Sequence, residues 1–152
     1  MSRKMTPAQI TAAHTRLSRT GKSLGIGFKF GGSIGSSRLA HRVLYLAGEQ
    51  DGSGETQSRV SVALFKRQFE LELDVSELEV VVAAAVEGGL EEVAVRGFLE
   101  RGGGVKEVED EAKRVRERGV RGVPQFFFAG EHSFEGAGDI EEFFEAFVKA
   151  RG

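Results

Sequence analysis

Few side chains in this sequence could carry out covalent or metal chemistry. None of its 152 residues is cysteine. That absence removes disulfides, thiolate metal ligands and every mechanism in which a thiolate is the nucleophile. The three histidines, His14, His41 and His132, lie far apart in the sequence and show no metal-ligand spacing. We therefore expect neither a metal site nor thiol catalysis from these residues.

The most informative stretch runs from Gly119 to Gly130 and contains Val123-Pro124. Pro124 has no N–H, so it should stand at the start of a strand, and it pushes Val123 towards extended geometry. The three consecutive phenylalanines 126–128 are typical of a strand buried on both faces, because alternate side chains point to opposite sides. Such a strand needs neighbouring strands and a covering layer on each face.

Composition and charge indicate a soluble globular protein. The chain is 40% hydrophobic and 29% charged, and its length fits a single domain over residues 1–152. A net charge of −2 gives no field that would attract nucleic acid or an anionic membrane. No apolar run approaches the ~20 residues that span a bilayer, and no apolar segment follows the basic N-terminus. We expect a cytoplasmic protein with no nucleic-acid or membrane partner.

Helical patterns dominate residues 6–118. Thr6 and Gln9 can form a capping box around Pro7, which predicts a helix that ends at Gly21. Apolar periodicity predicts further helices at about residues 36–47, 55–69, 77–87, 90–100 and 105–118. Ser76 and Glu79 are expected to form a second capping box. It opens a helix rich in valine and alanine, which we place at the centre of a helical layer.

Extended segments are predicted in two places. Residues 24–30 alternate apolar side chains with glycine and lysine. Residues 125–129 and 132–135 form a hairpin through a Gly130-Glu131 turn, followed by a last helix with Asp139 as N-cap and Glu142 as its partner. A two-stranded hairpin alone is marginal. The three phenylalanines therefore need more sheet than this chain supplies.

Several of these motifs occur together in one known family. Gly122-Val123-Pro124-Gln125-Phe126-Phe127-Phe128, followed by Gly130 and by Phe134-Glu135-Gly136-Ala137, resembles the C-terminal half of the DsbA-like thioredoxin family. The pattern is most similar to the FrnE-type, dithiol-disulfide isomerase-like branch. Upstream, Leu39-Ala40-His41-Arg42-Val43-Leu44, Leu64-Phe65-Lys66-Arg67-Gln68-Phe69 and Val75-Ser76 resemble helical motifs of that branch. The resemblance extends from about Thr6 to Ala150.

The resemblance implies an α/β, thioredoxin-like fold of the DsbA type. A large helical insertion block over residues 6–118 would be followed over residues 119–152 by a cis-proline loop, a β-hairpin and a C-terminal helix. In the family, an N-terminal strand–helix–strand unit carries the CxxC pair and supplies central strands. This sequence matches the part after that unit, so we expect those strands and cysteines to be missing from it. The family is a thiol-disulfide oxidoreductase family, but this cysteine-free chain should be redox-inactive.

The resemblance also implies a substrate-binding site. In thioredoxin folds the proline that corresponds to Pro124 is cis, and the backbone before it, here Val123, pairs with a substrate peptide or glutathione. The alternative is a trans proline that begins a strand. The loop at Gly138 and Asp139 is similar to one in the kappa glutathione transferase and 2-hydroxychromene-2-carboxylate isomerase branches, where a helix N-terminus helps to hold glutathione. The alternative there is simple capping by Asp139, which we favour.

Other polar residues are interpreted as structural. Ser36 and Ser37 are expected to cap a helix and not to act as nucleophiles, since the serine of the isomerase branch lies in the N-terminal unit. His41 could act as a general base, but a structural histidine at the helix–sheet junction is the preferred interpretation. His14 should lie at a boundary between core and surface, and His132 on the surface.

Three functions remain open. The chain could be a DsbA/FrnE-like protein without thiol chemistry. It could be a non-enzymatic binding module whose exposed sheet edge, beside residues 126–128, accepts a strand from a partner or from a second copy as a homodimer. It could also bind glutathione, which is the one cofactor that the sequence gives reason to consider.

Overall fold

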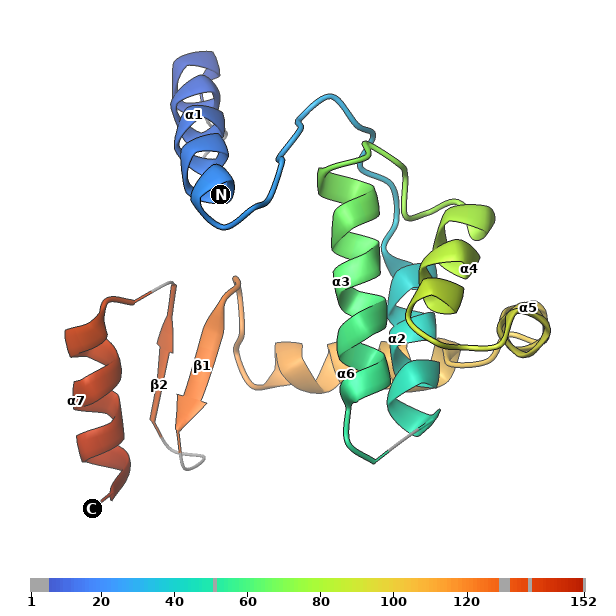
Figure 1. The fold of residues 1–152 in the computed structure, drawn as a ribbon. Helices are drawn as coiled ribbons and strands as arrows, with labels where there is room; N and C mark the ends of the chain where they lie inside the picture. Colours follow the sequence, from blue (N-terminus) through green and yellow to red (C-terminus); the bar gives the residue numbers. More distant parts are fainter. Residues whose placement is uncertain (1–5, 51, 129–131, 137, 152) are drawn as a thin grey trace. The chain divides into compact units, whose positions relative to one another are not determined.

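The computed structural model describes residues 6–50, 52–128, 132–136 and 138–151 (Figure 1). The chain divides into two compact units, residues 1–108 and residues 109–152. Among the described residues no helix has the length and apolar character needed to cross a bilayer. The elements are, in chain order, α1 (Pro7–Ser23), α2 (Arg38–Gln50), α3 (Glu55–Phe69), α4 (Leu78–Glu87), α5 (Glu92–Glu100), α6 (Val105–Glu117), β1 (Gln125–Phe128), β2 (His132–Glu135) and α7 (Ile140–Arg151).

The first helix begins as predicted. The N–H of Gln9 donates to Oγ1 of Thr6 at 3.3 Å, and the N–H of Thr6 donates to Oε1 of Gln9 at 2.8 Å. The alternating segment after α1 belongs to no strand. Hydrogen bonds instead attach it to the end of α3 and the residues that follow. The N–H of Lys29 donates to the carbonyl of Phe69 at 2.8 Å, and the N–H of Gly27 to the carboxylate of Glu70 at 2.9 Å.

The core of the first unit lies where α2, α3, α4 and α5 meet. Four of its fully buried side chains, Val43, Val60, Val81 and Val95, each come from a different one of these helices. Helix α4 packs against α2, α3 and α5, and Figure 1 shows these helices as one group. Val81, Val82, Ala84 and Ala85 of α4 are buried. The prediction that this helix is central is therefore confirmed.

The predicted capping box at Ser76 and Glu79 is wrong. Helix α4 has Glu77 as its N-cap, which makes no side-chain capping hydrogen bond. The N–H of Ser76 donates to the carboxylate of Asp74 at 2.8 Å. The hydrogen bond from the side chain of Ser76 and, after it, this backbone hydrogen bond hold the pKa of Asp74 below its usual value. The carboxylate of Glu79 is bound at both oxygens by Arg96, at 2.8 and 2.7 Å. This bidentate pair is stronger than a neutral capping bond, which explains the outcome.

Arginine side chains donate hydrogen bonds to backbone carbonyls at two helix ends. Nε and Nη2 of Arg42, in α2, donate to the carbonyls of Gly103 and Leu99, both at 2.7 Å, at the end of α5. Nε of Arg59, in α3, donates to the carbonyl of Gly88 at 3.0 Å, at the end of α4. The last carbonyls of a helix have no partner within it. Arg59 therefore gives the carbonyl of Gly88 a partner, whereas the carbonyl of Leu99 also accepts from the N–H of Gly102. The two guanidinium groups tie α2 to α5 and α3 to α4.

Besides the C-terminal part of α6, the second unit contains a hairpin covered on one face by a helix. Strands β1 and β2 pair antiparallel with Phe126 opposite Phe134, and α7 packs against both. The ring of Phe143, in α7, lies 4.8 Å from that of Phe126 and 5.0 Å from that of Phe134. Phe128 and Phe147 complete this aromatic cluster, with ring centroids 5.2 Å apart. The predicted turn at Gly130-Glu131 lies outside the described residues.

The prediction that the phenylalanine strand is buried on both faces is wrong. Phe127 points to the face opposite the aromatic cluster, as strand alternation requires, and 39% of it is exposed. Within the described part of this unit, α7 is the one helix packed on the sheet, and it covers the other face. The guanidinium carbon of Arg118 lies 3.8 Å from the centre of the Phe127 ring. A cation therefore takes the place of the second apolar layer.

Candidate functional site

A glycine turn connects α6 to the candidate site. Gly119 has a φ of +81°, the left-handed conformation that commonly follows the last residue of a helix. Its N–H donates to the carbonyl of Arg116 at 2.9 Å. The chain then passes through Gly122 to Val123.

The Val123–Pro124 peptide bond is cis, the isomer that the resemblance implied. Val123 is 90% exposed. Within the described residues, neither its N–H nor its carbonyl has a hydrogen-bond partner. The carbonyl of Pro124, in contrast, accepts a hydrogen bond of 2.8 Å from the N–H of Gly136, directly after β2. The proline is therefore anchored to the hairpin, and the backbone just before it faces solvent.

The strand that follows also has a free edge. In the described part of the chain β1 pairs only with β2. Its other edge presents N–H and carbonyl groups that no neighbouring strand satisfies, and such an edge can pair with another chain. The unpaired backbone of Val123 and this free edge of β1 follow one another along the chain, and we call them together the β1 edge (residues 123–128).

Gly138 and Asp139 do not present free amides. The N–H of Asp139 donates to Glu142 at 2.9 Å, while the N–H of Glu142 donates to Asp139 at 3.0 Å. This is the reciprocal capping box predicted for α7. The N–H of Gly138 donates to the carbonyl of Gly136 at 3.0 Å. Both amides are thus used inside the loop, and the neighbouring carboxylates disfavour a further anion there. Ala137, between these residues, lies outside the described residues.

Gly138 has a packing role. A Cβ at this position would lie 2.8 Å from Cε2 of Phe134 and 2.8 Å from Oε2 of Glu142. The absence of a side chain therefore lets the start of α7 approach β2. Since the N–H of Gly136 donates to the carbonyl of Pro124, the hairpin places this loop beside the proline. The structure brings the four predicted binding residues into one region, and within the described residues Val123 is the one of them whose N–H has no partner.

The other predicted residues play minor roles. Oγ of Ser36 accepts a hydrogen bond of 3.4 Å from the N–H of Arg38, and the carbonyl of Ser37 accepts one of 2.9 Å from the N–H of His41. His14 is half-buried and stacks on Phe30, in agreement with the predicted boundary position.

His41 does not have the structural role that we preferred for it. It is exposed on α2, and within the described residues its side chain has no interaction that would hold it at a junction. The side chain of His132 lies outside the described residues. In the described part of the chain no three potential ligands gather as a metal site.

A comparison of the sequence with protein-family models shows to which family the chain belongs. A model described as a DSBA-like thioredoxin domain matches residues 1–148. The chain belongs to the DsbA-like thioredoxin domain family. No curated protein matches the chain. In this DsbA-like domain, the family fold predicted from the sequence is confirmed, with a predominantly helical chain, a small antiparallel sheet and a C-terminal helix.

Arg118 is the residue at this site that the sequence did not reveal. It lies next to the glycine that follows α6, nine positions before Phe127. That separation matches neither helical nor strand periodicity, so pattern analysis gave no signal that the two side chains meet. Only the reversal of the chain at Gly119 brings the guanidinium over the open face of β1 in this DsbA-like domain.

Proposed function

We propose that this DsbA-like chain is of the FrnE type and binds an extended polypeptide along the β1 edge without exchanging thiols itself. The unpaired backbone of exposed Val123, at the head of a strand with a free edge, carries this proposal. A peptide would add as a further strand, in the recognition mode known as β-augmentation. The peptide's backbone groups would supply the partners that Val123 and β1 lack. Phe127 and Arg118 would contact its side chains on the open face.

Binding should depend on the N–H of Val123. Val123→Pro removes this donor, whereas Val123→Ala keeps it and shortens the exposed side chain. One hydrogen bond contributes ~0.5–1.5 kcal/mol, so Val123→Pro should weaken binding roughly 3- to 10-fold, while Val123→Ala should bind as the wild type does. Carboxymethylated insulin B chain is a suitable extended probe, measured by fluorescence anisotropy. Absence of wild-type binding at millimolar probe, or equal effects of the two substitutions, would contradict the proposal.

Thiol–disulfide exchange should be absent. The thiolate is the nucleophile in this exchange, and the sequence has no cysteine. In an insulin-reduction assay with dithiothreitol or glutathione, the rate with this chain should equal the rate in buffer. An active thioredoxin in parallel shows that the assay works. Turnover above the buffer rate would disprove the redox-inactive part of the proposal and leave the peptide-binding part untouched.

A second copy of the chain is the alternative occupant of the β1 edge. Unpaired edges associate with one another, and two β1 strands could pair antiparallel about a two-fold axis. Light scattering after size-exclusion chromatography distinguishes the cases. A dimer that the insulin B chain dissociates would show that copy and peptide use the same edge. A monomer at all protein concentrations would exclude the dimer. In a separate calorimetric titration, the absence of heat with millimolar glutathione would exclude glutathione as a ligand.

A further inference from the structure

The net charge of −2 conceals a strong asymmetry along the chain. The first 48 residues contain eight of the 21 lysines and arginines but none of the 23 aspartates and glutamates. Helix α1 carries Arg16, Arg19 and Lys22 and no acidic residue. Such a block attracts anions even when the whole chain does not. This basic block belongs to the first unit and is separate from the β1 edge.

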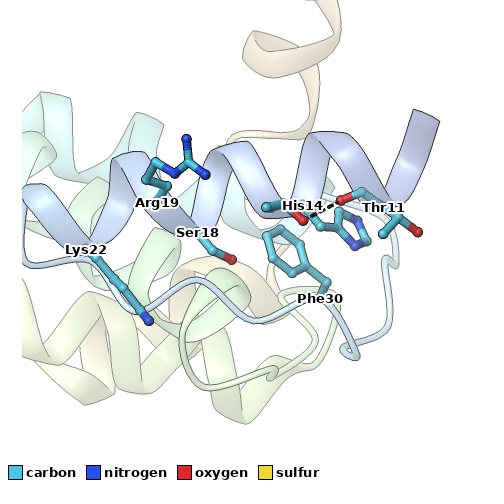
Figure 2. A pocket seen from close by; sticks show the side chains of 7 residues that line it. Thr11, His14, Ser18, Arg19, Lys22 and Phe30 are labelled. Carbon is cyan, nitrogen blue, oxygen red and sulfur yellow. Dashed lines mark hydrogen bonds between the residues drawn. The ribbon is translucent and has the colours of Figure 1, made fainter. Parts of the chain in front are cut away.

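A pocket of about 530 Å³ lies along α1 within this basic block. Its volume is in the range of small-molecule sites. It is lined by Thr11, His14, Thr15, Ser18, Arg19 and Lys22 of α1 and by Phe30 of the following segment. Figure 2 shows Phe30 beside His14, with Ser18 and Lys22 further along the same side of the helix.

One end of this pocket is aromatic. The rings of His14 and Phe30 are parallel within 6°, with their centroids 3.9 Å apart. Phe30 is 40% exposed, so part of its ring remains accessible to a ligand. A flat, exposed ring that is already held by a stacked partner is suited to stacking with a planar group.

The other end of the pocket is cationic and unpaired. Within the described residues neither Arg19 nor Lys22 has an ion-pair partner. No carboxylate lines the pocket. The carboxylates that contact the segment after α1, Glu70 and Glu72, accept hydrogen bonds from the amides of Gly27 and Gly31. The two cations are therefore free to bind an external anion.

The hydroxyl groups of Thr15 and Ser18 lie between the two ends. That of Thr15 donates to the carbonyl of Thr11 at 2.9 Å and keeps its oxygen free as an acceptor. The hydroxyl of Ser18 has no partner within the described residues. From His14 to Lys22 the helix rises about 12 Å. A ligand that spans the pocket thus presents a planar ring, a hydroxylated middle and an anionic group, in that order.

We propose that this pocket binds a nucleotide, with the base on Phe30, the ribose beside Thr15 and Ser18, and the phosphate at the end that Arg19 and Lys22 line. The unit recognised is one base with its sugar and phosphate. It can come from a free nucleotide or from single-stranded nucleic acid, where bases stack on aromatic side chains in the same way. The proposal concerns the first unit and is independent of the peptide-binding function proposed for the β1 edge.

Calorimetric titration with adenosine 5′-monophosphate tests this proposal. Adenosine and inorganic phosphate should each bind at least ~10-fold more weakly than the nucleotide, because each uses one end of the pocket. The double variant Arg19→Gln/Lys22→Gln should lose about 10-fold or more in affinity. Arg16→Gln removes a cation of the same helix that does not line the pocket, and it should bind as the wild type does. The His14 ring resonance should shift on titration.

Several results would overturn the proposal. The first is that no nucleotide binds at millimolar concentration, and the second is that phosphate binds as tightly as the nucleotide. The third is that the Arg16 variant and the double variant lose equal amounts of nucleotide affinity. Phe30→Leu should weaken the nucleotide but not phosphate, and an unchanged circular dichroism spectrum shows that the variant is folded. If Phe30→Leu does not fold, the charge variants decide the question alone. A single-stranded hexaadenylate that binds more tightly than the mononucleotide supports nucleic acid as the source, and one that binds no better supports a free nucleotide.

Discussion

Replacing Phe143 with alanine is expected to unfold the hairpin and α7 while α2–α5 stay folded. Its ring contacts both strands, at 4.8 Å from Phe126 and 5.0 Å from Phe134. Phe→Ala substitutions in cores cost about 3 kcal/mol or more. A unit as short as residues 109–152 buries too little surface to tolerate that loss. Hydrogen exchange followed by mass spectrometry should show lost protection in residues 125–128, 132–135 and 140–151, and unchanged protection in α2–α5.

Phe144→Ala is the matched control for this experiment. It makes the same change in the adjacent residue of the same helix, but Phe144 is 68% exposed. Protection in the second unit should therefore stay as in the wild type. If both substitutions reduced protection equally, the aromatic cluster would not be the source of stability in this unit. If Phe143→Ala also exposed α2–α5, the two units would not fold separately.

Gly88→Ala should destabilise the first unit. Gly88 is buried at the C-terminus of α4. A Cβ there would lie within van der Waals overlap of Cγ2 of Val60 and 2.8 Å from the backbone nitrogen of that residue. Because a backbone atom of a packed helix cannot rotate away, α3 and α4 would have to separate. Overpacking of this kind costs up to about 3 kcal/mol, which corresponds to a loss of roughly 10 °C in Tm.

Gly52→Ala provides the comparison for Gly88→Ala. A Cβ at Gly52 would have no atom within 4 Å. The substitution restricts the unfolded chain without a clash, so Tm should be unchanged or slightly higher. Thermal unfolding followed by circular dichroism at 222 nm measures both variants. An unchanged Tm for Gly88→Ala would mean that α3 and α4 can move apart at little cost, contrary to the packing described above.

Local signals in the sequence predicted most of the elements but not all of their ends. The capping predictions at Thr6 and Asp139 succeeded because the capping partners, Gln9 and Glu142, are only three residues away. Ser76 failed because Glu79 is bound by Arg96, 17 residues further along the chain. A single sequence does not show such competition between local and distant partners. The start of α5 has a local cause instead: this helix begins at Glu92 and not at Leu90 because Glu91 accepts hydrogen bonds from the N–H groups of Val93 and Ala94.

The sequence predicted where the candidate site lies, but not which of its backbone groups are free to bind a ligand. The resemblance around Val123 and Pro124 located the exposed backbone, whereas the amides of Gly138 and Asp139 proved to be bonded within their own loop. Burial of Phe127 was predicted from its apolar neighbours, but Arg118 reaches it only through the turn at Gly119. The pocket along α1 also escaped pattern analysis, since His14 and Phe30 belong to different local patterns, a helix and an alternating segment.

The guanidinium above Phe127 has a consequence for solubility. Three successive phenylalanines in a strand with a free edge are the composition of an aggregation-prone segment. Arg118 keeps a positive charge and its water on the open face of that strand. Stacking that face against another copy would strip the water from the charge, which is costly. A ligand with a group that compensates the charge of Arg118 could still approach this face. Arg118 therefore acts as a gatekeeper residue against non-specific self-association.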